Sequence, residues 1–363
     1  MSQATGSPFE TRRFASLLRT RVWPAGANRR PHPEQPAKQG SRRILCGLAL
    51  ALALTPAHAG PVVDRIRSGG VIRCGGVSRP GLVGQSPDGD KAAGLYLDLC
   101  RAIGAALLGP GGRIEFRPYD SDTAFDRVRD RTDDLSFLDG SEILDYGLAG
   151  KATPGPPVVF VSTAAMVPRD SAVRSLADLA GKTICFYQGS NAHRNLEAWM
   201  ASHHLDFGRM GLMEYGELYD TYNARVCDAQ VGEMGDLAVA RLDEAGARLK
   251  SRILTEPLAT FPILAVTPQS DPQWSAIVAW AVYALQRAEL PAAPWAASGL
   301  KSLAFNAADL GLADDWGAHV VGAAGTYADI YARNLGDRSR LNLPRGPNAP
   351  VEAGGWFVTP YRE

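Results

Sequence analysis

After a basic leader, the sequence alternates strand-like and helix-like segments. A β-rich run at 71–77 is followed by a helical pattern at 94–109 and by an alternating apolar run at 113–120. The segment 133–138 reads as the next strand. Because strands that alternate with helices need crossover connections, this order predicts a mostly parallel sheet.

The alternation then starts again, which predicts a second unit of the same kind. A long β-rich run at 158–167 opens it, and 175–191 reads as helix, turn, strand and loop. A strand at 224–233 follows a helix, an extended return occupies 252–267, and an amphipathic helix occupies 274–290. Two such units joined by two extended crossings predict an α/β fold of two lobes with a cleft between them.

The leader has the pattern of a secretory signal. Residues 44–55 form an uncharged apolar run directly after Arg42 and Arg43, and Ala57-His58-Ala59 follows it. A basic region, a short apolar region and an A-x-A site are typical of an export signal, and the run is too short to span a bilayer comfortably. We therefore expect 1–59 to be a basic leader and signal peptide, cleaved near Ala59-Gly60, and the rest to be periplasmic.

Two points about this leader stay open. Arg12-Arg13 and Arg42-Arg43 allow twin-arginine export beside the general secretory route, because neither pair stands in a complete motif. Residues 1–40 are basic and rich in proline, so they are expected to be disordered or to lie upstream of the true start codon.

The net charge of the chain hides the leader's imbalance. The whole chain has 38 basic and 38 acidic residues, but nine of the basic and only two of the acidic ones lie in 1–59. The remainder has 29 basic and 36 acidic residues, a net charge of −7. Since phosphate binding needs basic surface, we expect no nucleic-acid partner.

Motifs of the common catalytic and cofactor sites are missing from the sequence. It has no G-x-S-x-G elbow, no P-loop, no H-E-x-x-H motif and no zinc-type cysteine spacing. We therefore expect no enzyme activity, no cofactor and no metal centre. Four cysteines follow the leader, which predicts two disulfides in an oxidising compartment, and the residues alone allow three pairings: Cys74, Cys100, Cys185 and Cys227.

An acidic stretch at 137–145 is the most unusual local feature. Asp139, Glu142 and Asp145 recur at every third position, close to one helical turn. Ionised carboxylates only accept hydrogen bonds, and they repel one another unless a cation is present. The pattern alone allows a cation site, a catalytic pair or a solvated loop.

The order of motifs resembles that of a known family. The matching stretches run in order along most of the mature chain, and they include RCGG (73–76), GLYLDLCRAIGAAL (94–107), DTAFDRVRDRTDDLS (122–136), LADLAGKTICFYQGS (176–190), YNARVCDA (222–229) and LNLPRGPNAPVEAGGWF (341–357). They resemble the periplasmic solute-binding proteins of polar amino acid ABC importers, of family 3 type, in the general L-amino-acid-binding branch.

The resemblance implies a type II periplasmic-binding-protein-like fold. Its two α/β lobes would be joined by two crossing strands at 157–169 and 255–268. Lobe 1 would begin with 60–160, lobe 2 would be 161–262, and 263–363 would hold the return to lobe 1 and a C-terminal extension. The resemblance also implies the disulfides Cys74-Cys100 and Cys185-Cys227, a monomer, and an ABC permease in the inner membrane as partner.

The resemblance places the ligand site, and there the sequence departs from the family. Family members hold an α-carboxylate with an arginine, and Asp145 stands at that position here. The neighbouring small polar residues correspond to Phe137, Leu138 and Gly140, and a threonine corresponds to Glu142. An acidic group at this place would repel a carboxylate.

Lobe 2 keeps more of the family's pattern. Gly189-Ser190-Asn191 precedes a helix, where it can receive an anion or simply cap the helix. Glu233 corresponds to the family acid that binds an α-ammonium. Asp98 matches a family acid, or is a favourable charge in a first helical turn. Pro80, Gly81 and Leu82 match the loop over the ligand's side chain. The residues predicted to bind the ligand are Phe137, Leu138, Glu142, Asp145, Gly189, Ser190, Asn191, Glu233 and Leu82.

Three functions are compatible with this pattern. The first is a binding subunit of an amino-acid-type ABC transporter, whose small polar ligand is cationic or otherwise atypical, since four carboxylates would line the cleft. The second is an accessory protein that binds or matures another periplasmic protein. The third, weakened by the missing arginine, is a dehydratase-like enzyme.

Overall fold

The computed structural model describes residues 60–85, 92–119, 121–143, 147–148, 150–243, 251–290, 307–358 and 360. The predicted leader and signal peptide, residues 1–59, lie outside this part of the chain. Ala59, which precedes the predicted cleavage point, is therefore not described. Asp145 also lies outside the described part. Among the described residues, no helix is both long enough and apolar enough to cross a membrane.

Lobe 1 contains three parallel strands with helices in the connections. β1 (Val71–Val77) lies between β4 (Arg113–Tyr119) and β5 (Leu135–Asp139), and it is parallel to both. The helix α2 (Leu95–Leu108) connects β1 to β4, and α3 (Ser121–Arg129) connects β4 to β5. The first three expected strands and the first expected helix of the sequence are therefore present.

Lobe 2 repeats this parallel arrangement. β7 (Thr183–Tyr187) lies between β8 (Gly208–Leu212) and β9 (Ala229–Glu233) and is parallel to both. The helices of this lobe follow the strands in order, and they are α4 (Asn191–Ser202), α5 (Tyr215–Asn223) and α6 (Met234–Asp243).

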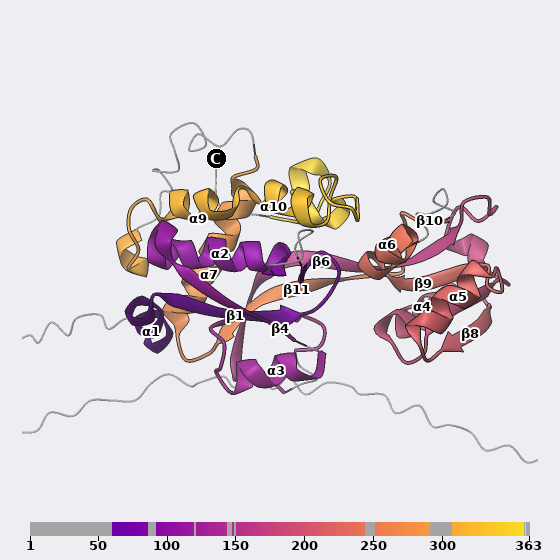
Figure 1. Cartoon of the computed structure of the whole chain (residues 1–363), viewed down its shortest axis with the longest axis horizontal. Helices are drawn as coiled ribbons and strands as arrows, with labels where there is room; N and C mark the ends of the chain where they lie inside the picture. Colours follow the sequence, from indigo (N-terminus) through magenta and orange to yellow (C-terminus); the bar gives the residue numbers. More distant parts are fainter. Residues whose placement is uncertain are drawn as a thin grey trace, which may run out of the picture. The chain divides into compact units, whose positions relative to one another are not determined.

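Two long antiparallel strands join the lobes into one sheet. β6 (Ala152–Pro168) pairs with β11 (Ala259–Pro268), then with β9 of lobe 2, while β11 pairs with β5 of lobe 1. The order is β4-β1-β5-β11-β6-β9-β7-β8, and β10 (Ser251–Ile253) pairs with β6. Figure 1 shows β6 and β11 running from the helices of lobe 1 to those of lobe 2. Each lobe thus contributes a set of parallel strands, and the antiparallel pair β6 and β11 lies between the two sets.

The chain returns to lobe 1 to complete its core. α7 (Pro272–Arg287) packs there with α1 (Pro61–Gly69), and the fully buried Asp271 caps α7 through Trp274 N at 2.9 Å. The same carboxylate accepts hydrogen bonds from Val62 N and Val63 N, so it also caps α1. The remaining described elements are β2 (Gly84–Gln85), β3 (Ala92–Ala93), α9 (Trp316–Ala324), α10 (Tyr327–Asn334), η1 (Gly109–Gly111), η2 (Ala177–Leu179), η4 (Ala307–Leu310), η5 (Gly346–Asn348) and η6 (Val351–Ala353).

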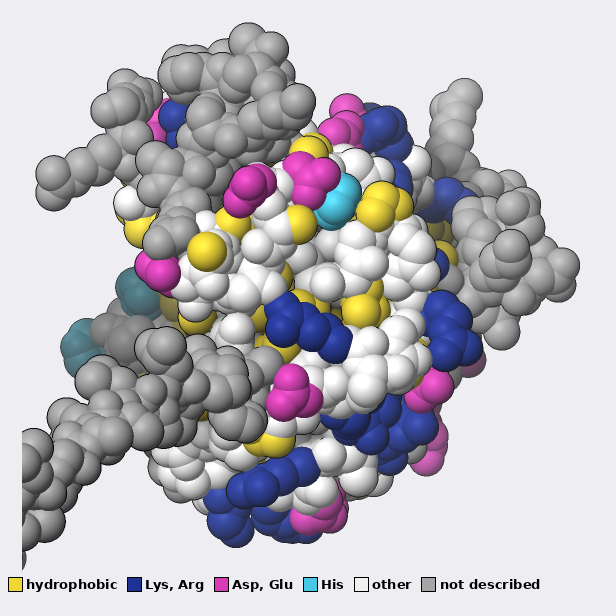
Figure 2. Space-filling model, turned by 90° about the vertical axis from the view of Figure 1, so that its left-hand side faces the viewer, with side chains coloured by type: hydrophobic (Ala, Val, Ile, Leu, Met, Phe, Trp, Pro, Cys, Tyr) yellow, Lys and Arg dark blue, Asp and Glu magenta, His cyan; other side chains and the backbone are white. Residues whose placement is uncertain are grey.

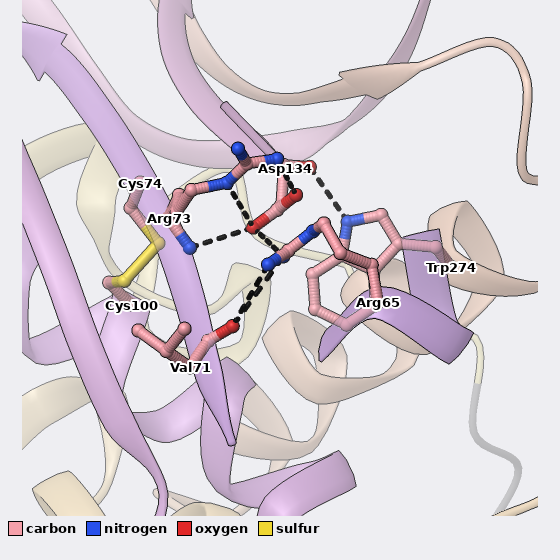
Figure 3. The surroundings of a disulfide bond; sticks show 7 residues. All are labelled: Arg65, Val71, Arg73, Cys74, Cys100, Asp134 and Trp274. Carbon is pink, nitrogen blue, oxygen red and sulfur yellow. Dashed lines mark hydrogen bonds and ion pairs between the residues drawn. A yellow bond between two sulfur atoms is a disulfide. The ribbon is translucent and has the colours of Figure 1, made fainter. Parts of the chain in front are cut away.

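Each lobe contains one disulfide. Cys74–Cys100 joins β1 to α2, and Cys185–Cys227 joins β7 to the turn before β9. Beside the first disulfide, the buried carboxylate of Asp134 accepts from the backbone N–H and the guanidinium of Arg73, and it pairs with Arg65 (Figure 3).

Trp274 adds a further contact to this region, because its Nε1 donates to the backbone oxygen of Asp134 at 2.7 Å (Figure 3). The indole belongs to α7, and Asp134 directly precedes β5. The region beside the first disulfide therefore fixes β1, β5 and α7 to one another, and it leaves the opposite ends of the strands for a site.

The surface carries charges of both signs. On the face drawn in Figure 2, basic and acidic side chains lie next to one another, with small hydrophobic patches between them. Several pairs on the described surface are in ion-pair contact, such as Arg209 with Glu197 and Arg225 with Asp170.

Candidate ligand-binding site

Two connected cavities lie between the lobes, with volumes of about 500 and 330 Å³. Val77, Arg79, Ser190 and Asn191 line both of them, so they form one cleft. The cleft lies where β1, β5, β7 and β9 end. The carboxyl ends of parallel strands are the usual ligand-binding edge of an α/β sheet, since loops and helix N-termini gather there.

Arg79 is held in this cleft by the turn that follows β1. The backbone N–H groups of Leu82 and Val83 donate to Arg79 O at 3.0 and 3.1 Å, which closes the turn. Leu95 N and Tyr96 N then donate to the carbonyls of Gly81 and Leu82, and these bonds attach the turn to the start of α2. Because the turn is tied to lobe 1 at both ends, the arginine side chain extends from a fixed base.

An ion pair between Arg79 and Glu233 crosses the cleft. Arg79 Nη1 lies 3.1 Å from one carboxylate oxygen of Glu233 and 3.0 Å from the other, and both side chains are less than one-fifth exposed. Arg79 comes from lobe 1, and Glu233 ends β9 in lobe 2. Within the described residues, the side-chain hydrogen bond of Arg79 is made by Nη1, so in this part of the chain Nε and Nη2 are donors that a ligand can use.

Burial changes the protonation of Glu233. Desolvation raises its pKa from 4.5 to about 7, and this effect exceeds the lowering by Arg79, with help from the negative charges of Asp236, Asp139 and Glu142. For Arg79, desolvation opposes the charge, but Glu233 and the other facing carboxylates raise its pKa overall. Near neutral pH, the carboxyl group is thus close to its titration midpoint.

This shift predicts a pH dependence of stability. A carboxyl group whose folded pKa is raised stabilises the fold fully below its unfolded pKa, and that contribution is lost as the pH rises through the folded pKa. In the ligand-free protein, we expect the Glu233 contribution to decline between about pH 5 and pH 8. Denaturant unfolding of the wild type and of Glu233→Gln across this range measures it.

The Glu233→Gln variant is needed because another buried carboxyl group has a raised pKa close to that of Glu233. Burial raises the pKa of Asp133 to about 6, so the wild type alone would report both groups. The difference between the two proteins isolates Glu233. An identical pH slope in both proteins would contradict the assignment.

A second polar contact, between Asn191 and Glu142, also joins the two lobes across the cleft. Asn191 Nδ2 donates to Glu142 Oε1 at 3.0 Å, and so joins the start of α4 to the turn after β5. The hydroxyl of Ser190 caps α4 by accepting from His193 N at 3.1 Å, and Gly189 N donates to His193 Nδ1. The capping role expected for Ser190 is therefore present, and all three residues of this loop line the smaller cavity.

Asp139 differs from the other carboxylates of the cleft. It is 4 % exposed, and its Oδ1 accepts from Ser141 N at 2.9 Å and from Ser141 Oγ at 2.7 Å. Its Oδ2 is buried and has no hydrogen-bond partner in the described part of the chain. The side chain lines the smaller cavity beside Arg79 and Glu142.

Aromatic rings form part of the cleft walls. Tyr96 and Phe137 are stacked with ring centroids 4.6 Å apart, and both line the smaller cavity. Tyr187 and Tyr215 are stacked at 4.4 Å and line the larger one. Rings of this kind pack against the apolar carbons of a ligand and leave its polar groups to the charged side chains.

Three of the predicted ligand residues do not line these cavities in the described structure or lie outside it. Leu138 is fully buried in a core cluster with Tyr119 and Phe125. It follows Phe137 in β5, and successive strand residues point to opposite faces, so only one of the two can reach the cleft. Leu82 lines a third, largely apolar cavity of about 120 Å³, which Arg79 and Glu233 also border, and Asp145 is not described.

Asp98 has a structural role. Its carboxylate accepts from Arg101, Arg333 and Asn334, at 2.9, 2.7 and 2.7 Å, and it thereby joins α2 to α10. Of the two interpretations of Asp98, these contacts favour a charge that stabilises the helices over a residue that contacts the ligand.

Arg79, in contrast, was not predicted, since an arginine beside Pro80 after a strand has the sequence pattern of a solvated turn. Its position at the carboxyl end of β1 is the one signal that could have indicated it.

Within the described residues, no three His, Cys, Asp or Glu side chains converge closely enough to hold a metal ion. The charged residues that line the two cavities are Arg79, Arg194, Asp139, Glu142, Glu233 and Asp236. The cleft is therefore mixed in charge, with an excess of carboxylates.

Comparison with known proteins finds amino-acid-binding proteins of ABC transporters among the sequence relatives of this chain. A general L-amino acid-binding periplasmic protein, AapJ, of Rhizobium johnstonii is 26% identical over 328 residues, covering 86% of this chain and 95% of that protein. BztA of Rhodobacter capsulatus, a glutamate/glutamine/aspartate/asparagine-binding protein, is 25% identical, covering 87% of this chain and 97% of its own length. The chain is a homologue of the periplasmic binding proteins of amino-acid ABC transporters.

Two further comparisons bear on the fold and on the middle part of the chain. The structure of an ABC transporter periplasmic binding protein from Brucella ovis with glutathione bound matches with a TM-score of 0.66 and 23% identity, covering 83% of this chain and 98% of that one. The fold is therefore that of type II periplasmic binding proteins, as predicted. A family model described as NMT1/THI5 like matches residues 161–256. The sequence relatives support a substrate-binding subunit of an amino-acid ABC transporter.

Proposed function

We propose that this chain is a periplasmic substrate-binding subunit of an ABC importer and that its cleft binds a small solute with both an ammonium and a carboxylate group. The observation that carries the proposal is the Arg79–Glu233 pair, in which opposite charges from two lobes meet inside the cleft. A zwitterionic solute offers each of these residues a partner of the opposite charge.

In this proposal, the solute adds one contact to each member of the Arg79–Glu233 pair. The free N–H groups of Arg79 receive the carboxylate in a fork-like geometry, to which guanidinium is well suited. Glu233 receives the ammonium, with Asp236 nearby on α6. Arg79 thus binds the solute carboxylate, which family members bind with an arginine at the position where this chain has Asp145.

Closure follows from where these groups originate. Arg79 and Glu142 belong to lobe 1, whereas Glu233 and Asn191 belong to lobe 2. A ligand that binds groups of both lobes stabilises the closed arrangement over an open one, which is the basis of a hinged binding protein. We propose that the closed, loaded protein then meets an inner-membrane permease, and that it acts as a monomer without catalysis.

The test is calorimetric titration of the periplasmic protein with a defined panel of solutes. The panel contains L-glutamine, L-glutamate, L-arginine, L-lysine, putrescine and glutathione, the last because the Brucella ovis protein holds it. We expect dissociation constants in the micromolar range or below for at least one solute with both charges, and a rise in melting temperature with it. Stabilisation at one hundred times the dissociation constant is about 2.7 kcal/mol.

The panel also separates the proposal from the alternative of an accessory protein. Absence of binding to every solute, together with a stoichiometric complex with another periplasmic protein, would contradict a transport role. Binding of putrescine alone would retain a cationic ligand but remove the carboxylate from the proposal.

A further inference from the structure

We propose that a contact between Arg241 and Leu341 holds the two lobes in the closed arrangement, and that both are positioning residues for solute binding. Neither residue lines the two cleft cavities, so neither touches the solute. The inference rests on the proposed function and deepens it, because it concerns closure of the same cleft. Leu341 begins the segment 341–348, which is called the C-terminal strap below.

The C-terminal strap is fixed to lobe 1. Arg345 forms a two-fold ion pair with Glu289, which follows α7, with N–O distances of 3.0 and 3.2 Å. The carboxylate side chain of this pair is only 5% exposed. The hydroxyl of Tyr331 on α10 donates to Pro344 O at 2.8 Å. Figure 1 shows the C-terminal part of the chain, in yellow, beside α10. The strap therefore moves with lobe 1.

The strap also contacts the crossing strand β6, through Asn348. Its Oδ1 accepts from Phe160 N at 2.7 Å, and its Nδ2 donates to Phe160 O at 3.0 Å. β9 pairs with β6 only from Thr163 onward, so the buried amide of Asn348 acts as the strand partner of Phe160. The strap is thereby attached to β6 just before this strand enters lobe 2.

Leu341 packs against the turn that carries Arg79. Gly81 of this turn has a φ of +76°, and a methyl group on it would lie 2.8 Å from Leu341 Cδ1 and 2.5 Å from Leu335 Cδ2. So close an approach in a left-handed conformation requires glycine. The side chain of Leu341 therefore supports the lobe 1 half of the Arg79–Glu233 pair from behind.

The backbone of Leu341 contacts lobe 2 through α6. This helix begins directly after Glu233, and its two faces pack in different places. Leu237 belongs to a cluster of lobe 2, whereas Ala238 belongs to the large core cluster that contains Leu341. Arg241 on the same helix donates from Nη2 to Leu341 O at 3.2 Å. One residue of the strap thus contacts both elements that carry the ion pair across the cleft.

These contacts act on the equilibrium between open and closed lobes. Glu233 and α6 are continuous in lobe 2, while the strap and the turn of Arg79 are both fixed to lobe 1. A rotation that separates Glu233 from Arg79 therefore also moves Arg241 away from Leu341. A contact made only in the closed arrangement raises the closed fraction, and the apparent affinity for a solute rises with this fraction.

The experiment uses Arg241→Met, which removes the guanidinium and keeps an apolar side chain. Arg252→Met is the matched control, because Arg252 is also partly buried and donates from Nη2 to backbone oxygens of Ser171 and Val173, within lobe 2. The periplasmic forms of the wild type and of both variants are titrated with the same panel of solutes. Small-angle X-ray scattering gives the radius of gyration of each protein with and without solute.

For Arg241→Met, we expect an affinity about fivefold lower for every solute that the wild type binds, since the closed arrangement alone loses a hydrogen bond from a charged donor. The factor should be the same for each solute, because the residue acts on closure and not on the ligand. Without solute, the radius of gyration should exceed that of the wild type, and saturation with solute should restore it. Arg252→Met should change neither quantity.

The two measurements complement each other. A protein that is mainly open without solute loses affinity, whereas one that is mainly closed expands, so a change in either quantity supports the role of the contact. Wild-type values of both quantities, losses that differ between solutes, or a gain in affinity would overturn it and leave the proposed function intact.

Arg241→Lys serves as a second variant, in case methionine disturbs folding. It keeps a charged donor, so it should lose less affinity than Arg241→Met, and a loss equal to that of Arg241→Met would speak against the hydrogen bond to Leu341. If the folded wild type binds no solute, the proposed function fails. The scattering of the solute-free proteins then still decides whether this contact holds the lobes together.

Discussion

Replacing Arg79 with methionine is expected to weaken ligand binding by roughly thirtyfold or more, since breaking a buried hydrogen-bonded charge pair typically costs about 2–5 kcal/mol. The substitution removes the more buried of the two arginines that line the two cleft cavities. It leaves Glu233 among Asp139, Glu142 and Asp236 without compensation, so the pKa of Glu233 should rise further. Calorimetric titration with the best solute of the wild type measures the loss.

Two variants make this prediction specific. Arg79→Lys keeps the charge but loses the planar fork of donors, so it should recover only part of the affinity. Arg117→Met removes an arginine whose side chain is 48% exposed on β4, and it should leave affinity unchanged. If the Arg79→Met variant binds the same solute within threefold of the wild type, the ligand carboxylate is held elsewhere.

The second large effect is expected from the disulfide of lobe 2. Cys185–Cys227 closes a loop with a sequence separation of 42. A cross-link over such a loop removes disorder from the unfolded chain and stabilises a fold by roughly 4 kcal/mol. The Cys185→Ser/Cys227→Ser double variant should therefore have a clearly lower melting temperature, by about 6 °C for a chain of this size.

The lobe 1 disulfide provides the comparison. Cys74–Cys100 has a sequence separation of only 26, so its removal should cost slightly less, roughly 3.5 kcal/mol. Differential scanning calorimetry of both double variants, with and without reductant, compares the two. Loss of less than 2 °C in the lobe 2 variant would mean that its core alone, formed by residues such as Ile184, Phe186 and Leu196, determines stability.

Much of the architecture could be predicted from local patterns. The buried strands β1, β6 and β11 are β-rich runs, and α2 and α7 have apolar residues at helical spacing, so each pattern survives in the fold. β8 was not predicted, since GRMGL contains two glycines and is largely exposed. It is a strand because it pairs with β7, and such pairing over a distance is not visible in five residues.

The candidate site shows the same division between local and long-range information. The sequence indicated the acidic stretch, but a spacing of three does not reveal which carboxylate becomes buried. Asp139 is buried because it ends β5, which has a neighbouring strand on each side, while Glu142 lies in the following turn and reaches Asn191. The role of Arg79 becomes apparent only from its contact with Glu233, which lies 154 positions away in the other lobe.

The way in which β6 and β11 connect the lobes also bears on how such a protein can evolve. Ser162 and Thr260 are paired neighbours in the sheet, so the chain leaves lobe 1 and returns to it at adjacent points. The NMT1/THI5-like match, 161–256, falls almost entirely inside this excursion. Lobe 2 is therefore a module with two neighbouring junctions, and recombination at these strands can exchange one half of a binding site while the other half stays intact.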